Sequence, residues 1–250
     1  MIICEIGLNH MGDENEAKSL TLGLLKSKIN AITFQVREND FYKKGKNQKL
    51  ILPETFYHDI VKIIKNSGLK IGIALAEETK IDFFERLDVD FYKILSKDLE
   101  NYNLIKKIKR TKKPIFISTG MSDLSQIEKL VQFVSHEKQY FTLIHTQLSH
   151  NIDDVNLEVI SLLKRKFEIP VAYGHHSINP YVLFLSLAFK PSDIFFYVKR
   201  NTFENYPDNE HAINLDDLSF YLENLEELQK SLGSKNKLKM KNLINENFEI

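Results

Sequence analysis

Charged side chains stand at the ends of short apolar runs in this 250-residue sequence. Four of them are cations: Arg37, Lys93, Lys199 and Arg200. Arginine and lysine bind phosphate and carboxylate groups through charge-assisted hydrogen bonds, so a site built from these residues predicts an anionic ligand. Lys93 lies inside an apolar run, where a buried lysine needs an anionic partner, and we favour a functional role for it over a structural one.

A carboxylate and two histidines occupy similar places. Glu5 lies within the apolar run 2–7, where it is either a buried, hydrogen-bonded carboxylate or a substrate contact. His175 and His176 follow the run 170–174, and neighbours on a strand point to opposite faces, so only one of them can reach a shared site. That histidine either binds a metal, moves a proton or forms a hydrogen-bonded wall, and the alternatives stay open.

The apolar runs alternate with stretches of helical periodicity. Near-continuous apolar runs are typical of parallel strands covered on both faces. Eight such runs cover residues 2–7, 31–36, 70–75, 91–95, 114–119, 140–146, 170–174 and 193–198. Residues 215–233 form a final predicted helix that ends at Gly233. Eight strand–helix units predict a TIM (β/α)8 barrel rather than a doubly wound sheet, and the barrel brings the polar strand ends together.

Composition limits the partners and the organisation. The 34 basic and 34 acidic side chains balance, which argues against nucleic acid or anionic lipid as a partner. The first residues lack a basic signal-peptide segment, and no apolar stretch approaches the roughly 20 residues of a membrane span. Cys4 is the only cysteine, so we expect a cytoplasmic protein without an internal disulfide. We expect one barrel domain over residues 1–233 and a polar tail over residues 234–250.

Seven segments together resemble the sialic acid synthase family, whose members make N-acetylneuraminate, legionaminate and pseudaminate. In order, over residues 2 to about 225, they are ICEIGLNHMGD, ITFQ, FYKILSKDLEN, ISTGMSDLSQIE, DDVNLEVISLLK, PVAYGHHS and PDNEHAINLDDL. The resemblance implies a metal-dependent condensation, with Mn²⁺ or Mg²⁺, of phosphoenolpyruvate with an open-chain N-acyl hexosamine. The products would be a nine-carbon 2-keto sugar acid and phosphate. We take a homodimer through the barrel as the default assembly.

The same resemblance assigns catalytic and phosphoenolpyruvate-binding roles. It implies that Lys93 and Ser96, in the YKI-x-S segment, and Ser118, in STGM, contact phosphoenolpyruvate. Glu5 and Glu210 are implied as carboxylates on the sugar side. We therefore predict Glu5, Lys93 and Glu210 as the catalytic residues.

Metal and substrate contacts complete the predicted site. His176 matches the family's metal-binding histidine in SDHT, and His175 is the second predicted metal ligand. The other predicted substrate contacts, beyond Ser96 and Ser118, are Asn9, Gln35, Arg37, His150, Lys199 and Arg200.

Several positions depart from the family's pattern. The replacements are Thr33 for the lysine of KFQ, Ala74 for a threonine after strand three, His150 for the tyrosine of TSxYP, His175 for the aspartate of SDHT, and Arg200 for the second metal histidine in KHFT. We also expect the protein to lack the C-terminal antifreeze-like domain of the family.

Two hypotheses follow from these departures. One is a diverged synthase in which Arg37 and Arg200 supply positive charge. The other is a catalytically degenerate barrel that binds a sugar or phosphate ligand or assists an active synthase.

Overall fold

The computed structural model describes residues 1–234 and contains a closed barrel of eight parallel strands. The strands are β1 (Ile2–Gly7), β2 (Ala31–Val36), β3 (Lys70–Leu75), β4 (Phe91–Ile94), β5 (Ile115–Ser118), β6 (Phe141–His145), β7 (Val171–Gly174) and β8 (Ile194–Lys199). Each strand pairs with the next in chain order, and β8 closes the ring by pairing with β1. The predicted TIM barrel is confirmed. The tail predicted after residue 233 lies, apart from Ser234, outside the described residues, and the domain boundary stays a prediction.

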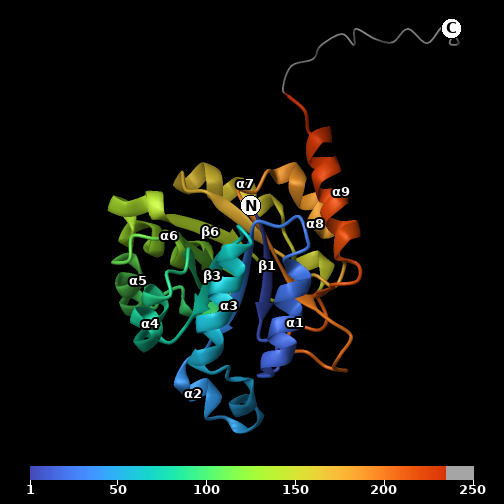
Figure 1. The fold of residues 1–250 in the computed structure, drawn as a ribbon. Helices are drawn as coiled ribbons and strands as arrows, with labels where there is room; N and C mark the ends of the chain where they lie inside the picture. Colours follow the sequence, from blue (N-terminus) through green and yellow to red (C-terminus); the bar gives the residue numbers. More distant parts are fainter. Residues whose placement is uncertain (235–250) are drawn as a thin grey trace, which may run out of the picture.

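Helices cover the outside of the barrel, and α2 lies at one end of it (Figure 1). The α-helices are α1 (Glu14–Leu24), α2 (Asn39–Tyr42), α3 (Glu54–Asn66), α4 (Ile81–Arg86), α5 (Tyr102–Lys109), α6 (Leu124–Phe133), α7 (Glu158–Phe167), α8 (Val182–Ser186) and α9 (Leu218–Ser231). Short 3₁₀ turns are η1 (Gly45–Leu50), η2 (Glu78–Lys80), η3 (Ser96–Asp98), η4 (Ser135–Tyr140), η5 (Ile152–Asp154) and η6 (Leu187–Phe189). The short strand β9 (Ile213–Asn214) pairs in parallel with the end of β8.

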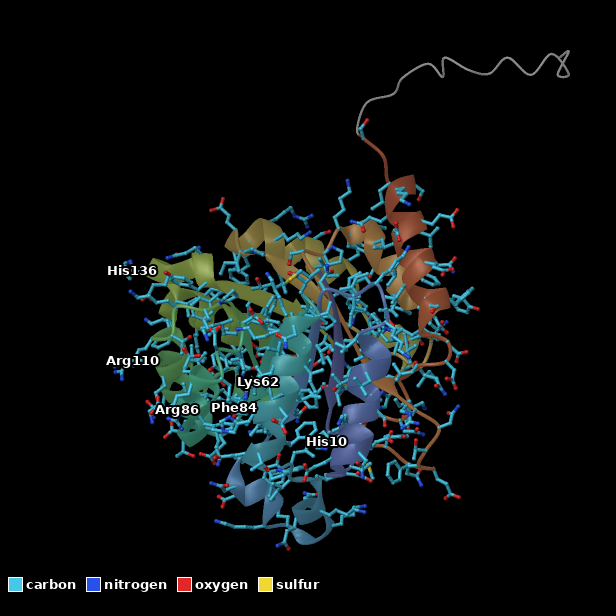
Figure 2. The ribbon with its side chains drawn as sticks, in the orientation of Figure 1. His10, Lys62, Phe84, Arg86, Arg110 and His136 are labelled. Carbon is cyan, nitrogen blue, oxygen red and sulfur yellow. The ribbon has the colours of Figure 1, made fainter. Side chains whose placement is uncertain are left out.

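Local sequence explains where individual helices begin and end. Asp123 and Gln126 form a capping box at the start of α6, which satisfies two backbone N–H groups that the helix leaves free. Gly233 follows α9 with a φ of 51°, the left-handed conformation of the predicted stop. Arg110 and His136, on the outer surface of the barrel, face solvent (Figure 2). No helix within residues 1–234 is long and apolar enough to cross a membrane.

The inside of the barrel has an apolar layer beneath a polar one. Side chains of a strand alternate between its faces, so residues two positions apart point to the same side. The apolar cluster inside the barrel is Ile3, Ala31, Phe91, Phe116, Ile144, Ala172 and Phe195. Two positions further along the same strands stand Glu5, Thr33, Lys93, Ser118, Thr146, Gly174 and Tyr197. The strand period therefore places a layer of mostly polar side chains directly above this apolar cluster, which we call the apolar plug, on the side where the strands end.

Gly72 of β3 leaves space for the apolar plug. A Cβ at this position would lie 2.1 Å from the Phe91 ring, which packs against the Phe116 ring at a centroid distance of 5.2 Å. Because that ring has no free space to move into, Gly72→Ala is expected to lower the free energy of unfolding by about 2–3 kcal/mol. Urea unfolding measures this loss. A Gly72→Ala/Phe91→Leu variant should lose less than the sum of the two single variants, and strict additivity would show that the clash is not the cause.

Candidate active site

A cavity of about 310 Å³ opens where the strands end. TIM barrels carry their catalytic residues at this end, on strand ends and the loops that follow them. The predicted site residues that line the cavity are Gln35, Arg37, Lys93, Ser96, Ser118, His150 and His176. The structure therefore brings together side chains that are far apart in the sequence, although their roles remain predictions.

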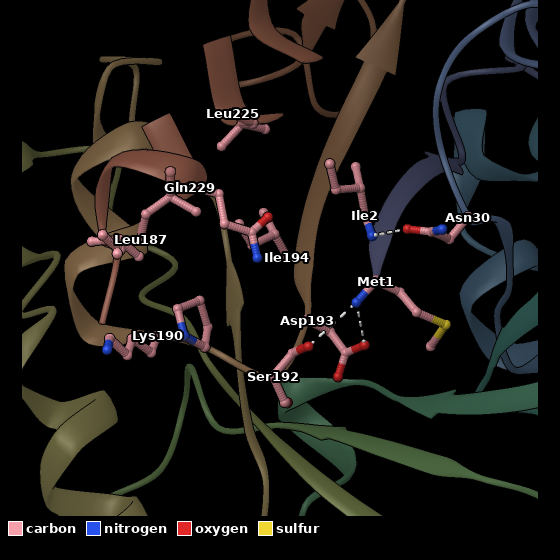
Figure 3. Close-up of a pocket in the computed structure, with 13 residues that line it drawn as sticks. Met1, Ile2, Asn30, Leu187, Lys190, Ser192, Asp193, Ile194, Leu225 and Gln229 are labelled. Atoms are coloured by element: carbon pink, nitrogen blue, oxygen red, sulfur yellow. Dashed lines mark hydrogen bonds and ion pairs between the residues drawn. The ribbon is translucent and has the colours of Figure 1, made fainter. Parts of the chain in front are cut away.

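A larger cavity, of about 440 Å³, lies at the opposite end of the barrel. It is bounded by the first residues of β1 and β8 and by the last turns of α9, as Figure 3 shows. Its charged groups include the N-terminal ammonium, which lies 2.9 Å from the Asp193 carboxylate. In a TIM barrel this end contributes to stability rather than to chemistry, and we place the candidate site at the other end.

Lys93 and Glu5 form a buried ion pair at the base of the site. The Lys93 Nζ atom lies 2.7 and 2.5 Å from the two Glu5 carboxylate oxygens, and the side chains are only 5% and 2% exposed. The ammonium also lies 5.4 Å from the centre of the Phe195 ring and 5.6 Å from that of Tyr197. A buried charge is tolerated only with such partners. Glu5 is therefore the anionic partner that a buried Lys93 was expected to need.

The second carboxylate near Lys93 in the cavity is Asp208, not the predicted Glu210. Burial, together with the negative charge of Glu5, raises the pKa of Asp208 to about 7, although Lys93 partly opposes the shift. The Asp208 side chain is 21% exposed and lines the cavity. By contrast, the Glu210 side chain is 65% exposed and reaches only His150, at 3.5 Å. The physical reason is the path of the loop after β8, which turns Asp208 inward and leaves Glu210 at the rim.

Gly7 permits the close approach of Asp208 and Tyr197 to β1. Gly7 has a φ of 57°, which favours glycine. A Cβ on this residue would lie 2.5 Å from the Tyr197 ring and 3.3 Å from the Asp208 carboxylate. The absence of a side chain at position 7 therefore allows both groups to reach the cavity.

Three histidine rings form a stack along one wall. The His176 and His211 rings lie 4.6 Å apart and the His211 and His150 rings 5.0 Å apart, with interplanar angles of 27° and 23°. His176 Nδ1 shares a hydrogen bond of 2.7 Å with Thr146 Oγ1. Burial lowers the pKa of His176 well below its usual value, and burial and neighbouring positive charge lower that of His211 to about 3. His176 and His211 are therefore neutral at physiological pH.

This arrangement does not fit the predicted metal centre. His175 points to the other side of the strand from His176, where Tyr173 lies 3.2 Å from its Nδ1 atom. The stacked rings of His176, His211 and His150 present parallel faces to one another, so their nitrogen atoms do not converge on one point. Within residues 1–234, no group of three or more histidine, cysteine or acidic side chains is placed to hold a metal. His175 and His176 therefore do not form the predicted pair of metal ligands.

Two predicted substrate contacts hold a loop instead of lining the cavity. Asn9 is fully buried, donates to the Val198 carbonyl at 2.9 Å and accepts from the Asp208 N–H at 3.1 Å. Lys199 donates to the backbone and side-chain oxygens of Asn209 at 2.6 and 2.9 Å. These bonds fix the loop after β8. Asn9 and Lys199 therefore position Asp208 rather than a ligand.

Arg200 lies outside the cavity, contrary to its prediction as a substrate contact. It follows Lys199 and points to the opposite side of the chain, where its Nη1 donates to the buried Glu16 carboxylate at 2.9 Å. Tyr206 donates to the other Glu16 oxygen at 3.0 Å. The guanidinium therefore ties the loop after β8 to α1.

Arg200→Gln should consequently affect stability more than ligand binding. The variant leaves Glu16 with Tyr206 as its remaining donor, and the Arg200 side chain is 39% exposed, so we expect a loss of about 1 kcal/mol in unfolding free energy. The affinity for phosphoenolpyruvate, the ligand expected from the sequence, should change by less than about twofold when measured by calorimetry, a shift of only a few tenths of a kcal/mol. A tenfold loss of affinity with unchanged stability would show that Arg200 contacts the ligand, as the sequence predicted.

Hydroxyl groups line the wall beside Lys93. The Ser96 and Ser118 Oγ atoms lie 2.7 Å apart, and both residues line the cavity with Gln35. Thr33, at the position of the family's KFQ lysine, directs its hydroxyl towards Glu5 at 3.5 Å. Paired hydroxyls can donate to the oxygen atoms of an anionic ligand. The pair predicted from the sequence is therefore in place.

Four further lining residues with polar side chains were not among the predicted site residues: Lys97, Tyr197, Asp208 and His211. Tyr197 could have been found, because it stands two positions after Phe195 on the same strand. Lys97 follows the predicted Ser96 in the 3₁₀ turn η3, and His211 lies in the quoted PDNEHA segment. Asp208 lies in the same segment, two residues before Glu210, and the sequence provides no means of choosing between these two acidic residues.

The barrel and the buried lysine–carboxylate cluster at its mouth define a TIM-barrel protein with a site for a small polar ligand. The NeuB family profile matches residues 23–237, and the chain belongs to that family. An uncharacterized protein of Methanocaldococcus jannaschii is 31% identical over 96% of this chain and 74% of its own length. The N,N'-diacetyllegionaminic acid synthase of Campylobacter jejuni is 24% identical over 93% of this chain and 77% of its length.

A solved structure supports the fold independently. The sialic acid synthetase of Leptospira borgpetersenii superposes with a TM-score of 0.88 at 24% identity, covering 96% of this chain and 87% of that one. A truncated 3-deoxy-D-arabino-heptulosonate 7-phosphate synthase of Thermotoga maritima reaches 0.76 at 11% identity, covering 94% and 88%. The family resemblance is confirmed, and the relatives support a function like that of a nonulosonic acid synthase.

Proposed function

We propose that this chain condenses phosphoenolpyruvate with an N-acyl hexosamine to give a nine-carbon 2-keto sugar acid and phosphate. The observation that carries the proposal is the buried cluster of Lys93, Glu5 and Asp208 at the base of a barrel-mouth cavity in a NeuB family member. A buried lysine–carboxylate pair is costly, and a neighbouring carboxylate with a raised pKa, such as Asp208, is typical of functional sites.

In this proposal each residue of the site has its own role in the reaction. Lys93, with the hydroxyls of Ser96 and Ser118, would hold the anionic groups of phosphoenolpyruvate. As C3 of phosphoenolpyruvate attacks the aldehyde carbon, the aldehyde oxygen gains a proton. Asp208 keeps its proton up to about pH 7 and can donate it to that oxygen. Water then attacks C2, the C–O bond breaks and phosphate leaves. Glu5 would face the sugar.

One observation favours a second candidate, a barrel that binds a ligand without turning it over. Arg200 lies outside the cavity, and the donor atoms of the histidine stack do not converge. Groups that cooperate in catalysis are strongly non-additive, so the loss of two of them lowers turnover by orders of magnitude. Such a protein would bind phosphoenolpyruvate or a sugar, or assist an active synthase, without releasing phosphate.

Phosphate release distinguishes the two candidates. Purified protein is incubated with phosphoenolpyruvate and each of a panel of N-acyl hexosamines, with Mn²⁺, with Mg²⁺ or with a chelator. Sugar-dependent release supports the synthase. Absence of release from protein shown to be folded by circular dichroism, with measurable binding of phosphoenolpyruvate, would replace it with the ligand-binding barrel.

A further inference from the structure

Three charged residues form a network at the mouth of the cavity. Arg37 and Lys97 both line the cavity, and Glu38 contacts both of them. The Arg37 Nε and Nη2 atoms donate to the two Glu38 carboxylate oxygens at 3.1 and 3.2 Å, and Lys97 Nζ lies 3.3 Å from Glu38 Oε2. This two-point contact is the geometry in which arginine binds a carboxylate or a phosphate group.

Helix α2 fixes the position of the arginine. The Arg37 guanidinium lies 4.0 Å from the centre of the Phe41 ring, and the backbone N–H of Arg37 donates to the Tyr42 hydroxyl at 3.1 Å. The Arg37 side chain is 18% exposed. The guanidinium is thus held at the cavity before any ligand arrives, which lowers the entropic cost of binding.

Because Lys93 is already paired with Glu5, an anionic ligand in the cavity needs a second cationic group. Among the described lysines and arginines that line it, Lys93 is neutralised by Glu5. Arg37 and Lys97 are the other two. Lys97 also pairs with Asp98 at 2.9 Å, whose side chain is 9% exposed, whereas Glu38, the partner that the two cations share, is 33% exposed. Because Glu38 is next to the solvent, its carboxylate can leave by side-chain rotation alone, whereas Glu5 cannot. The mouth is therefore where a strongly charged group can replace an internal carboxylate.

Glu38 stays charged in this contact. Although partial burial raises its pKa, the hydrogen bonds from Arg37 and the charges of Arg37 and Lys97 lower it to about 2. A phosphate dianion carries more charge than the carboxylate and offers more acceptor oxygens. It is therefore the better ligand for Arg37 and Lys97, which share the Glu38 carboxylate.

We propose that Arg37 and Lys97 form a phosphate subsite at the cavity mouth, and that Glu38 occupies it in the ligand-free protein as an internal competitor. This inference deepens the proposed function, because it assigns a phosphate-bearing end to the ligand. It makes Glu38 a residue that sets affinity without contacting the substrate. The affinity for phosphate should then rise when the Glu38 charge is removed.

Calorimetric titration with inorganic phosphate tests the subsite directly. Glu38→Gln should bind phosphate about fivefold more tightly than the unaltered protein, because a partly exposed ion pair contributes about 1 kcal/mol. Lys97→Gln should bind it about fivefold more weakly. Glu128→Gln is the matched control, since Glu128 on the outer helix α6 pairs with Lys166 at 3.4 Å, and its affinity should not change. In a protein that also carries Arg37→Gln, the gain in phosphate affinity that Glu38→Gln produces should be smaller.

The outcomes separate this inference from the proposed function. Unchanged or weaker phosphate binding by Glu38→Gln, or no phosphate binding at all, would overturn the subsite even if the protein condenses its substrates. A parallel titration with pyruvate, which offers only a carboxylate, identifies the ligand group. A gain for pyruvate alone would overturn the assignment to phosphate. Tighter phosphate binding without any condensation would retain the subsite and reject the synthase.

Discussion

Lys93→Met is expected to lower sugar-dependent phosphate release by about a thousandfold, at the upper end of what the loss of one stabilising group costs. Lys93 is the cation at the base of the cavity, beside the Ser96 and Ser118 hydroxyls, and methionine matches its length without its charge. Initial rates at saturating phosphoenolpyruvate measure the effect. Retention of a tenth or more of the rate would remove Lys93 from the catalytic residues.

The same substitution also tests the buried ion pair, so stability must be separated from catalysis. Removing Lys93 leaves Glu5 buried without its cation, which is expected to cost about 3–5 kcal/mol of unfolding free energy. In the Glu5→Gln/Lys93→Met variant the uncompensated charge is gone, and urea unfolding should recover most of that loss. Phosphate release should stay low in this folded double variant. Recovery of both together would mean that Lys93 acts only through stability.

Asp208→Asn is expected to change how stability depends on pH. The pKa of Asp208 is about 7 in the folded protein, against an ordinary value of 3.8, so the folded state holds a proton that the unfolded chain releases. Its contribution to stability is therefore complete below pH 3.8 and is lost as the pH rises to about 7. Asparagine does not titrate. The unfolding free energy of the unaltered protein should thus fall relative to Asp208→Asn by about 2–4 kcal/mol between pH 4 and 7.

Glu210→Gln provides the matched control for Asp208→Asn. Glu210 stands two residues after Asp208 in the same loop, but its side chain is 65% exposed. Its removal should reduce phosphate release by less than about twofold, whereas Asp208→Asn should reduce release by about a hundredfold through loss of the proton donor. Equal effects of the two substitutions, or a larger one for Glu210→Gln, would restore the sequence-based choice of Glu210.

The barrel could be predicted from the sequence because its strands obey a local rule. Eight apolar runs separated by helical stretches fixed the strands to within one residue at each end. The two-residue period then explains why Glu5, Lys93 and Ser118 share the polar layer, since each follows an apolar plug residue on its own strand. The same rule decided between the adjacent histidines, and His176 is the one that lines the cavity.

The residues that could not be predicted lie where the chain leaves the strands. In the loop after β8, the bonds that turn Asp208 inward come from Asn9, which is remote in the sequence. The direction of Arg200 depends on Glu16 of α1 in the same way. Glu38 carried no signal because its role arises from the meeting of two loops, one with Arg37 and one with Lys97. Long-range contacts, not residue types, decide these positions.

The central claim is that this cavity joins phosphoenolpyruvate to an N-acyl hexosamine, and mass spectrometry of the reaction mixture tests it most directly. With both substrates present, we expect a nine-carbon 2-keto sugar acid in an amount equal to the phosphate released, and none when either substrate is omitted or when the Glu5→Gln/Lys93→Met variant is used. Folded protein that binds phosphoenolpyruvate but forms no such acid with any sugar of the panel would contradict the claim.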